Sequence, residues 1–309
     1  MATVFLTGGS GFIGRHVTAE LVSGGHDVRA LARSADSAAA VESIGGHAVM
    51  GDLLRAGSWQ DEAASADWVI HLGSPSPFGG RLSSKRADAY ARVRTAVDRA
   101  LFDALVHARA ERAVYVSGFS YYGASGGPAI TEDVEPQPYA LGRVLSDAFD
   151  LVEPHLLMGV PIVSAFPGIV YGNGSWFAEH VIRPILAGRP VVRFGRITPL
   201  QPAIHVRDCA RAIVHLAQHG KVGGRYFLAN DQPARLDEIV AQLARQLGRR
   251  LRMLTLPRAL APLLLGRLLA EYGERDAVLS NARLRALGFS FLYPTIADGV
   301  REVAGGLHV

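Results

Sequence analysis

The chain has 309 residues, of which 49% are hydrophobic and 19% are charged, and its formal net charge is +4. A chain of this length can bury a substantial core as one large unit or two closely joined lobes, and its composition argues against disorder. The basic residues, almost all arginine, are scattered rather than gathered in a stripe, so we expect no nucleic-acid partner. The single cysteine, Cys209, excludes an internal disulfide framework, and we expect no metal site.

The hydropathy pattern gives no indication of a membrane span. The most apolar stretch, residues 254–272, is interrupted by Pro257, Arg258, Pro262 and Arg267. A first strand that begins at residue 2 leaves no room for a signal peptide. We therefore expect a cytoplasmic protein with no membrane partner, and the sequence leaves open whether it forms a homodimer.

The first half of the chain alternates strand and helix patterns at the pace of βαβ units. Strand patterns, several of them the continuous apolar runs typical of parallel strands covered on both faces, predict strands over residues 2–6, 27–31, 48–51, 68–72, 113–117 and 160–166. Helical patterns fill the intervals, and the longest covers residues 84–108. This alternation predicts an α/β fold, a Rossmann-type doubly wound parallel sheet with its ligand beyond the carboxyl ends of the strands.

After Tyr171 the alternation loosens, and strong helical patterns remain around residues 208–218 and 236–247. We predict a Rossmann domain over residues 1–170 and a smaller lobe, mainly for substrate binding, over residues 171–309. Residues 203–219 are ambiguous, because they can also return to the Rossmann sheet.

A glycine-rich turn joins the first strand to the first helix. The run is Thr7-Gly8-Gly9-Ser10-Gly11-Phe12-Ile13-Gly14, and the helix that follows carries Ile13, Val17 and Leu21 on one side. Glycines at this spacing permit a tight turn and a close approach of the backbone to a pyrophosphate, which the first N–H groups of the helix then face. The context predicts a dinucleotide site, and an ordinary glycine-rich turn is the alternative.

Residues after the second and third strands bear on the kind of dinucleotide. An acidic residue at the end of the second strand commonly binds the ribose diol of NAD, whereas an arginine accommodates the 2′-phosphate of NADP. Here Arg33 stands at that place, and no acidic residue occurs before Asp36, so we predict NADP(H), with NAD(H) as the alternative. Asp52 and Leu53 are placed to hold the adenine ring, unless Asp52 only caps a turn.

These motifs resemble the extended short-chain dehydrogenase/reductase family, also called the NAD-dependent epimerase/dehydratase family. The cofactor turn, the Asp52-Leu53 pair and residues 69–73, 167–172 and 205–210 are similar to family segments, and the resemblance spans about the whole chain. It implies a nicotinamide cofactor bound by the following residues: Thr7, Gly8, Gly11, Phe12, Ile13, Gly14, Arg33, Asp52, Leu53, Leu72, Gly73, Tyr139, Arg143 and Pro167.

The same resemblance implies a catalytic tyrosine followed four residues later by a lysine. Here Tyr139 is followed by Arg143, and on a helix this spacing places both side chains on one face. A neighbouring cation would lower the pKa of the tyrosine and so let it act as a general acid or base. Arg143 can supply the positive charge but cannot release a proton.

The family's further hydroxyl, at the end of the fifth strand, falls on Gly118 in this chain. Ser117 and Ser120 flank that position, and we predict that Ser120 substitutes for the missing hydroxyl, with Tyr121 and Tyr122 as alternatives. A serine that only satisfies a turn is an equally acceptable interpretation of Ser120.

The predicted activity is that of an NADP(H)-dependent oxidoreductase, a ketoreductase or alcohol dehydrogenase, acting on a mainly apolar carbonyl or alcohol with Tyr139 as acid or base. The apolar stretch 254–272 and the aromatic residues of the second half favour an apolar pocket, although core packing needs the same residues. One alternative is a nucleotide-sugar epimerase; family dehydratases carry an Asp-Glu pair where this chain has Phe119-Ser120. Another, suggested by Gly118 and Arg143, is an NAD(P)-binding isomerase, cyclase or regulator without net redox turnover.

Overall fold

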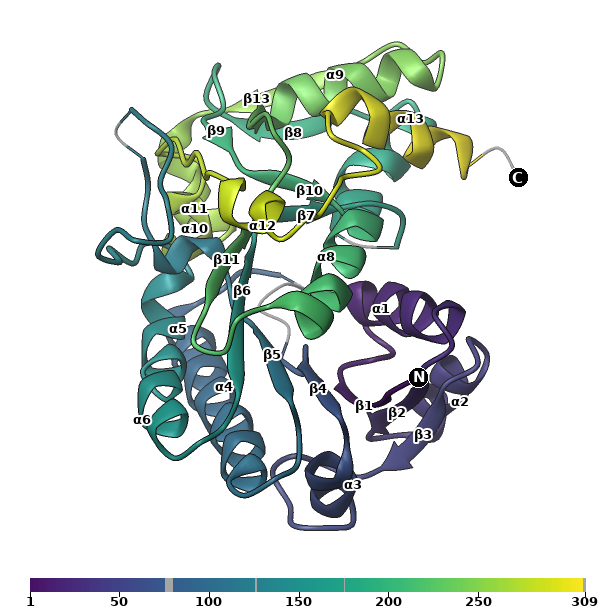
Figure 1. The fold of residues 1–309 in the computed structure, drawn as a ribbon. Coiled ribbons are helices and arrows are strands. Elements are labelled where there is room, and N and C mark those ends of the chain that lie inside the picture. The colour runs from purple at the N-terminus through teal and green to yellow at the C-terminus, as the bar shows by residue number, and fades with distance from the viewer. Residues whose placement is uncertain (76–79, 126, 175, 308–309) are drawn as a thin grey trace.

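The computed structural model describes residues 1–75, 80–125, 127–174 and 176–307. Within them, a seven-stranded parallel sheet has the strand order β11-β6-β5-β4-β1-β2-β3 (Figure 1). Its strands, in chain order, are β1 (Thr3–Thr7), β2 (Asp27–Ala32), β3 (His47–Met50), β4 (Trp68–His71), β5 (Arg112–Val116), β6 (Ile162–Pro167) and β11 (Arg225–Leu228).

This strand order confirms the predicted doubly wound Rossmann-type sheet. The first six strands were predicted from their strand patterns, and each lies within two residues of its predicted bounds. The order reverses between β1 and β4, which is where such sheets bind their ligands. The seventh strand, β11, was not predicted; it pairs in parallel with β6 although it follows it by almost sixty residues.

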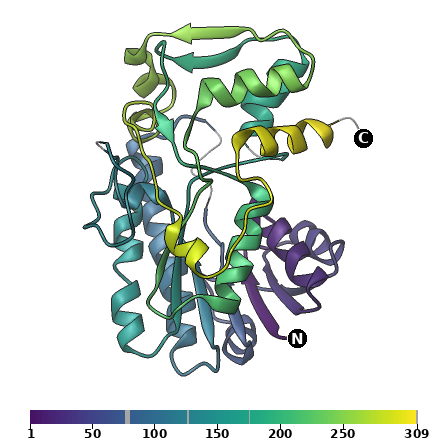
Figure 2. The same ribbon diagram turned by 45° about the horizontal axis from the view of Figure 1, so that its top comes forward.

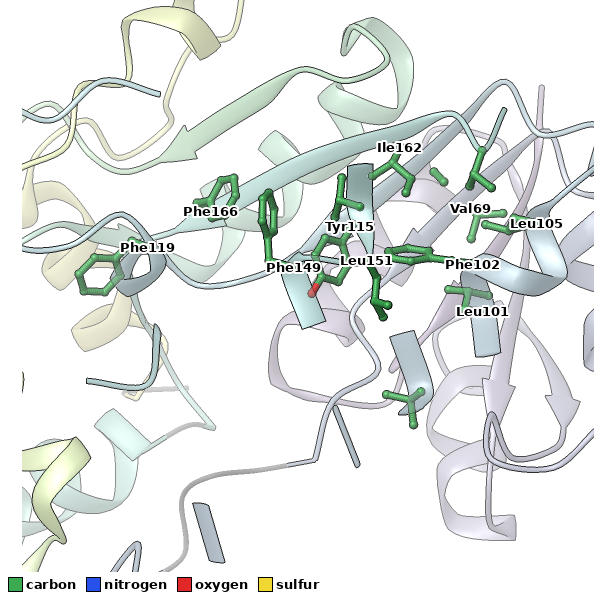
Figure 3. Packing of buried hydrophobic residues seen from close by; sticks show 14 of the residues in the cluster. Val69, Leu101, Phe102, Leu105, Tyr115, Phe119, Phe149, Leu151, Ile162 and Phe166 are labelled. Atoms are coloured by element: carbon green, nitrogen blue, oxygen red, sulfur yellow. The ribbon is translucent and has the colours of Figure 1, made fainter. Parts of the chain in front are cut away.

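Helices cover both faces of the sheet (Figure 1). On one face lie α1 (Phe12–Ser23) and α8 (Val206–His219), and on the other lie α3 (Trp59–Ser65), α4 (Ser84–Leu105), α5 (Gly142–Phe149) and α6 (Val152–Leu157), while α2 (Ala35–Glu42) packs beside β2 and β3. Residues 206–219, which the sequence left ambiguous, therefore lie against the sheet as α8. Figure 3 shows the aromatic part of the second face, where Phe102 and Phe149 pack beside Tyr115 of β5.

The other elements form a smaller group that continues from the carboxyl end of β6 (Figure 2). Its strands pair two by two: β7 (Ile169–Tyr171) with β10 (Ala203–His205), β8 (Val191–Phe194) with β13 (Met253–Leu256), and β9 (Leu200–Gln201) with β12 (Ala234–Arg235). Its helices are α7 (Arg183–Leu186), α9 (Leu236–Gln246), α10 (Ala261–Leu264), α11 (Arg267–Glu271) and α13 (Ile296–Gly305). Between them, α12 (Ala282–Ala286) returns to the sheet and packs against β11. Short helical turns occur at Phe119–Tyr121, Ala178–Ile182 and Arg258–Leu260.

The small group has a core of its own, in which α9 and α13 pack around Phe177 and Val240. The chain enters this group after β6, returns to the sheet for α8 and β11, and then enters the group again. Among the described residues, no helix has the length and apolar character needed to cross a bilayer.

Candidate active site

The glycine turn after β1 is built for close approach by a ligand. Gly8 has a φ of +75°, and a Cβ at this position would lie 2.9 Å from the carbonyl of Leu72. A Cβ on Gly14 would lie 1.9 Å from the carbonyl oxygen of Gly8, so only glycine lets α1 start this close to the turn. Gly11 is the N-cap of α1 and no side chain in the described part of the chain caps it, so the first N–H groups of the helix remain available to an anion.

A cavity of about 620 Å³ opens where the strand order reverses. Eight of the predicted cofactor-binding residues line it: Thr7, Gly8, Gly11, Arg33, Asp52, Leu53, Leu72 and Gly73. Ser34 and Ser37, which the sequence analysis did not single out, also line it beside Arg33. Asp52 has a second role, because its Oδ1 accepts a hydrogen bond from the N–H of Leu54 at 3.0 Å and so also caps a turn.

The other predicted cofactor residues lie outside the lining of this cavity. Phe12 and Ile13 form the first turn of α1 and are half-buried. Pro167 is buried at the end of β6, where it pairs with Leu228 of β11. Tyr139 and Arg143 belong to the separate group of residues beyond β5 that is described below.

A buried polar network lies directly beneath the glycine turn. The Thr7 hydroxyl accepts a hydrogen bond from the N–H of Gly73 at 2.9 Å and lies 2.6 Å from Nδ1 of His71. Nε2 of His71 in turn lies 2.8 Å from Oδ1 of Asp98, a fully buried carboxylate of α4. Because an ionised carboxylate only accepts, this arrangement assigns the ring proton of His71 to Nε2.

Asp98 is the centre of this network. Its Oδ2 accepts hydrogen bonds from Nε of Arg94 at 2.8 Å and from the hydroxyl of Tyr115 at 2.7 Å. Burial alone would raise the pKa of Asp98, but Arg94, His71 and Tyr115 outweigh it and hold that pKa below its usual value. Arg94 also donates to the carbonyl of Val116 at 2.9 Å, so the network connects the cofactor turn with the end of β5. The sequence feature that could have indicated this network is Arg94 and Asp98, an arginine and an aspartate four residues apart on the apolar side of a helix.

Tyr139 is almost fully buried, and its hydroxyl forms no hydrogen bond within the described residues. The prediction that it shares a helix face with Arg143 is wrong, because α5 begins only at Gly142 and Ala140 has a left-handed φ of +48°. The cause is packing against the turn after β5. The N–H of Tyr139 donates to the carbonyl of Ser120 at 3.0 Å, and a Cβ on Gly142 would lie 2.1 Å from the same oxygen.

Arg143 forms an ion pair with Glu271. Its side chain is half exposed, and its guanidinium donates to Oε1 of Glu271 at 2.7 Å. Burial raises the pKa of Tyr139 far above its usual value, with smaller effects from Tyr272 and Glu271 in the same direction and from Arg275 in the opposite one. This is the reverse of the predicted direction, because burial disfavours the deprotonated form of the Tyr139 hydroxyl.

The turn after β5 brings Ser120 next to the missing hydroxyl. A Cβ on Gly118 would lie 4.0 Å from Oγ of Ser120, which is fully buried. The hydroxyl of Ser117 is also buried and forms no hydrogen bond with any described residue. Tyr121 and Tyr122 instead belong to the aromatic core, where Tyr121 packs on Phe149 at 4.4 Å between ring centroids.

A residue that no motif indicated completes this group. The hydroxyl of Tyr272, which follows α11, donates to Oγ of Ser120 at 2.8 Å, and its ring lies 5.6 Å from that of Tyr139. Burial raises the pKa of Tyr272 as well, so this hydroxyl is a donor at neutral pH. Tyr272 also lines an apolar cavity of about 140 Å³ together with Ile169, Trp176 and Phe177. The described residues contain no group of three or more His, Cys, Asp or Glu side chains that could hold a metal ion.

A Rossmann sheet with a glycine-turn cavity at its switch point and a buried tyrosine beyond β5 defines an enzyme of the short-chain dehydrogenase/reductase type. The family model for the NAD dependent epimerase/dehydratase family matches residues 4–229, and the chain therefore belongs to that family. This membership assigns a nicotinamide dinucleotide as the cofactor class, which the glycine cradle and the free helix N-terminus fit.

Individual relatives are more distant. The chain is 28% identical over 253 residues to 4-hydroxy-2-methyl-3-oxo-4-farnesyl-3,4-dihydroquinoline-1-oxide ketoreductase of Stigmatella aurantiaca, covering 79% of this chain and 73% of the other. A human epimerase family protein solved with NADPH superimposes with a TM-score of 0.81 at 22% identity, covering 98% and 99% of the two chains. The UDP-glucuronic acid 4-epimerase of Bacillus cereus, solved with UDP-glucuronic acid and NAD, gives a TM-score of 0.82 at 20% identity over 99% of each chain. At these identities the two structures support the fold alone.

Proposed function

We propose that the protein is an NADPH-dependent reductase of apolar ketones, or the corresponding alcohol dehydrogenase in reverse. The observation that carries this proposal is the Tyr139 hydroxyl, which is buried, protonated and without a partner among the described residues. Its neighbour Tyr272 lines an apolar cavity. A cavity of this character suits an apolar carbonyl better than a nucleotide sugar, and the relative from Stigmatella aurantiaca is named a ketoreductase.

The cofactor preference rests on the rim of the larger cavity. Arg33, Ser34 and Ser37 line it together, and the guanidinium of Arg33 provides donors for a 2′-phosphate. The hydroxyls of Ser34 and Ser37 bond to each other and form the capping box of α2. Thr7, Gly8 and Gly11 would hold the pyrophosphate and Asp52 with Leu53 the adenine. A bound nicotinamide supplies or accepts the hydride.

The chain's own part in the reduction is to orient the ketone and protonate it. Tyr139 donates its hydroxyl proton to the carbonyl oxygen as the carbonyl carbon is reduced, and solvent restores that proton after the alcohol leaves. Burial raises the pKa of Tyr139, which keeps its hydroxyl protonated but makes it a weaker general acid than a tyrosine beside a cation would be. The smaller lobe, which is the part of residues 171–309 outside the sheet and its helix α8, would choose the substrate, since most of the residues lining the apolar cavity belong to it.

The test is NADPH oxidation with 1-decalone, cyclohexanone and UDP-glucuronic acid as candidate substrates. We expect turnover of the apolar ketones, and a loss of kcat of about 100-fold or more in Tyr139→Phe with little change in NADPH affinity. Tyr226→Phe is the matched control, because the Tyr226 hydroxyl is bonded to the N–H of Lys221 away from the site. Turnover of the nucleotide sugar alone would favour the epimerase alternative, and full activity in Tyr139→Phe would refute the role of Tyr139.

One observation favours the alternative without redox turnover. Arg143, the cation expected beside the tyrosine, is engaged by Glu271 instead. In that case the protein would bind NADPH but oxidise none of it with any of the three substrates.

A further inference from the structure

The hydroxyl of Ser120 has one proton that no described residue accepts. A serine hydroxyl offers one donor and two acceptor sites. Tyr272 occupies one acceptor site at 2.8 Å, and Oγ of Ser120 forms no other hydrogen bond with the described residues. Ser120 is nevertheless fully buried, so bulk water does not reach this hydroxyl.

Ser120 also lies where a hydroxyl is missing. Its Oγ is 4.0 Å from the position that a Cβ on Gly118 would take, and the side chain of Leu145 lies 3.3 Å from that position. The N–H of Tyr139 is bonded to the carbonyl of the same serine, which fixes Ser120 and Tyr139 relative to one another. The segments that carry the Ser120 and Tyr139 hydroxyls are therefore held together by this hydrogen bond.

We propose that Tyr272 is a positioning residue of the active site, which orients the Ser120 hydroxyl so that its free proton binds the substrate oxygen in place of the hydroxyl absent at position 118. A hydroxyl that accepts one hydrogen bond also becomes a somewhat better donor of the next. Tyr139 then protonates the oxygen that Ser120 holds. This inference rests on the proposed reduction of an apolar carbonyl.

The neighbouring residue fixes Tyr272 in place. Glu271 accepts from the N–H of Ala140 at 2.9 Å through Oε2 and from Arg143 at 2.7 Å through Oε1. Two consecutive residues at the C-terminal end of α11 thus contact both segments that carry the predicted catalytic groups, residues 118–120 and 139–143. Tyr272 also lines the apolar cavity, so it is the residue that connects this cavity with the Ser120 hydroxyl.

The test is a double-mutant cycle with Tyr272→Phe, Ser120→Ala and the double variant of the full chain. The phenylalanine keeps the ring in the cavity wall and removes only the hydroxyl, and Tyr226→Phe controls for the loss of an unrelated tyrosine hydroxyl. We expect Tyr272→Phe to lower kcat for 1-decalone about tenfold, the effect of one hydrogen bond, with NADPH affinity unchanged. The double variant should be no slower than Ser120→Ala, because Tyr272 acts through the serine.

A second readout does not require turnover. The fluorescence of Trp176, a residue of the cavity wall, reports binding of 1-decalone to the protein loaded with NADP⁺, which cannot reduce the ketone. We expect Tyr272→Phe and Ser120→Ala each to weaken binding of 1-decalone, and the double variant to bind no more weakly than Ser120→Ala. Unfolding in urea verifies that each variant is folded. Effects of the two substitutions that multiply, or a Tyr272→Phe variant within about twofold of the parent in both readouts, would overturn the inference.

The two proposals fail differently. A parent protein that binds 1-decalone without reducing any ketone overturns the proposed function, and the binding cycle still decides on Tyr272. A parent that neither binds nor reduces the ketone overturns both.

Discussion

Replacing Asp98 with asparagine tests the buried network beneath the cofactor turn. The carboxylate is fully buried and accepts from Arg94, His71 and Tyr115 at 2.7 to 2.8 Å. Asparagine has almost the same shape but keeps one acceptor oxygen and turns an NH₂ group toward groups that are themselves donors. Arg94 would keep its charge, because a guanidinium does not deprotonate in proteins, and would retain only the carbonyl of Val116 as a partner.

The expected cost follows from that unpaired charge. Removing one partner of a buried ion pair lowers the free energy of unfolding by about 3–5 kcal/mol. At about 2–4 °C for each kcal/mol, the melting temperature should fall by at least roughly 6 °C. NADPH affinity should fall as well, since His71 would lose the partner that holds it against Thr7 in the turn.

The assay is urea unfolding followed by circular dichroism, combined with an NADPH titration of the folded variant. Asp88→Asn is the matched control, because Asp88 is exposed on the same helix and forms no ion pair within the described residues. We expect a change within about 0.5 kcal/mol for this control. A loss below about 1 kcal/mol in Asp98→Asn would refute the reasoning, since it would mean that the carboxylate does not hold a buried charge.

Three further outcomes follow from the site. Arg33→Ala should weaken NADPH by about tenfold more than NADH in a fluorescence titration, the effect of a lost hydrogen bond between charged groups, and equal losses would remove the NADP(H) preference. Gly14→Ala should weaken binding of either cofactor by at least about tenfold, because its Cβ would lie 1.9 Å from the Gly8 carbonyl oxygen. The control is Gly305→Ala, whose Cβ would have no described atom within 4 Å and which should leave cofactor binding unchanged. Burial lowers the pKa of His71 below its usual 6.5, so below pH 6.5 the unfolded state takes up a proton that the folded state does not. The urea midpoint should therefore fall as the pH drops from 6.5 toward the folded pKa. A midpoint that stays constant over this pH range would contradict this account.

The sequence predicted what depends on local residues. The turn at Thr7–Gly14 needs glycine at fixed places, and six strands have strand patterns, several of them continuous apolar runs, so both were visible without the fold. The four-residue strand β11 was missed, because so short a segment after a glycine-rich stretch gives little periodic signal.

The arrangement around Tyr139 depended on contacts between distant segments. The helix starts late because Gly142 packs against the Ser120 carbonyl, and Tyr272 meets Ser120 across 152 positions of the chain. Arg143 was expected to face Tyr139 from its spacing, but Glu271, from yet another segment, binds its guanidinium. Such pairs are set by tertiary packing, which no motif or spacing encodes.

Because the chain returns to the sheet after β10, a truncated protein or one with an exchanged lobe must keep α8 and β11. A fragment ending at residue 170 would lack β11 and leave the backbone of Ser164 to Pro167 as an unpaired edge, a template for aggregation. The smaller lobe is therefore inserted in two pieces, one before α8 and one after β11. Exchanging this lobe between relatives would require grafting both pieces at once while residues 206–228 and α12, which packs against β11, stay with the sheet.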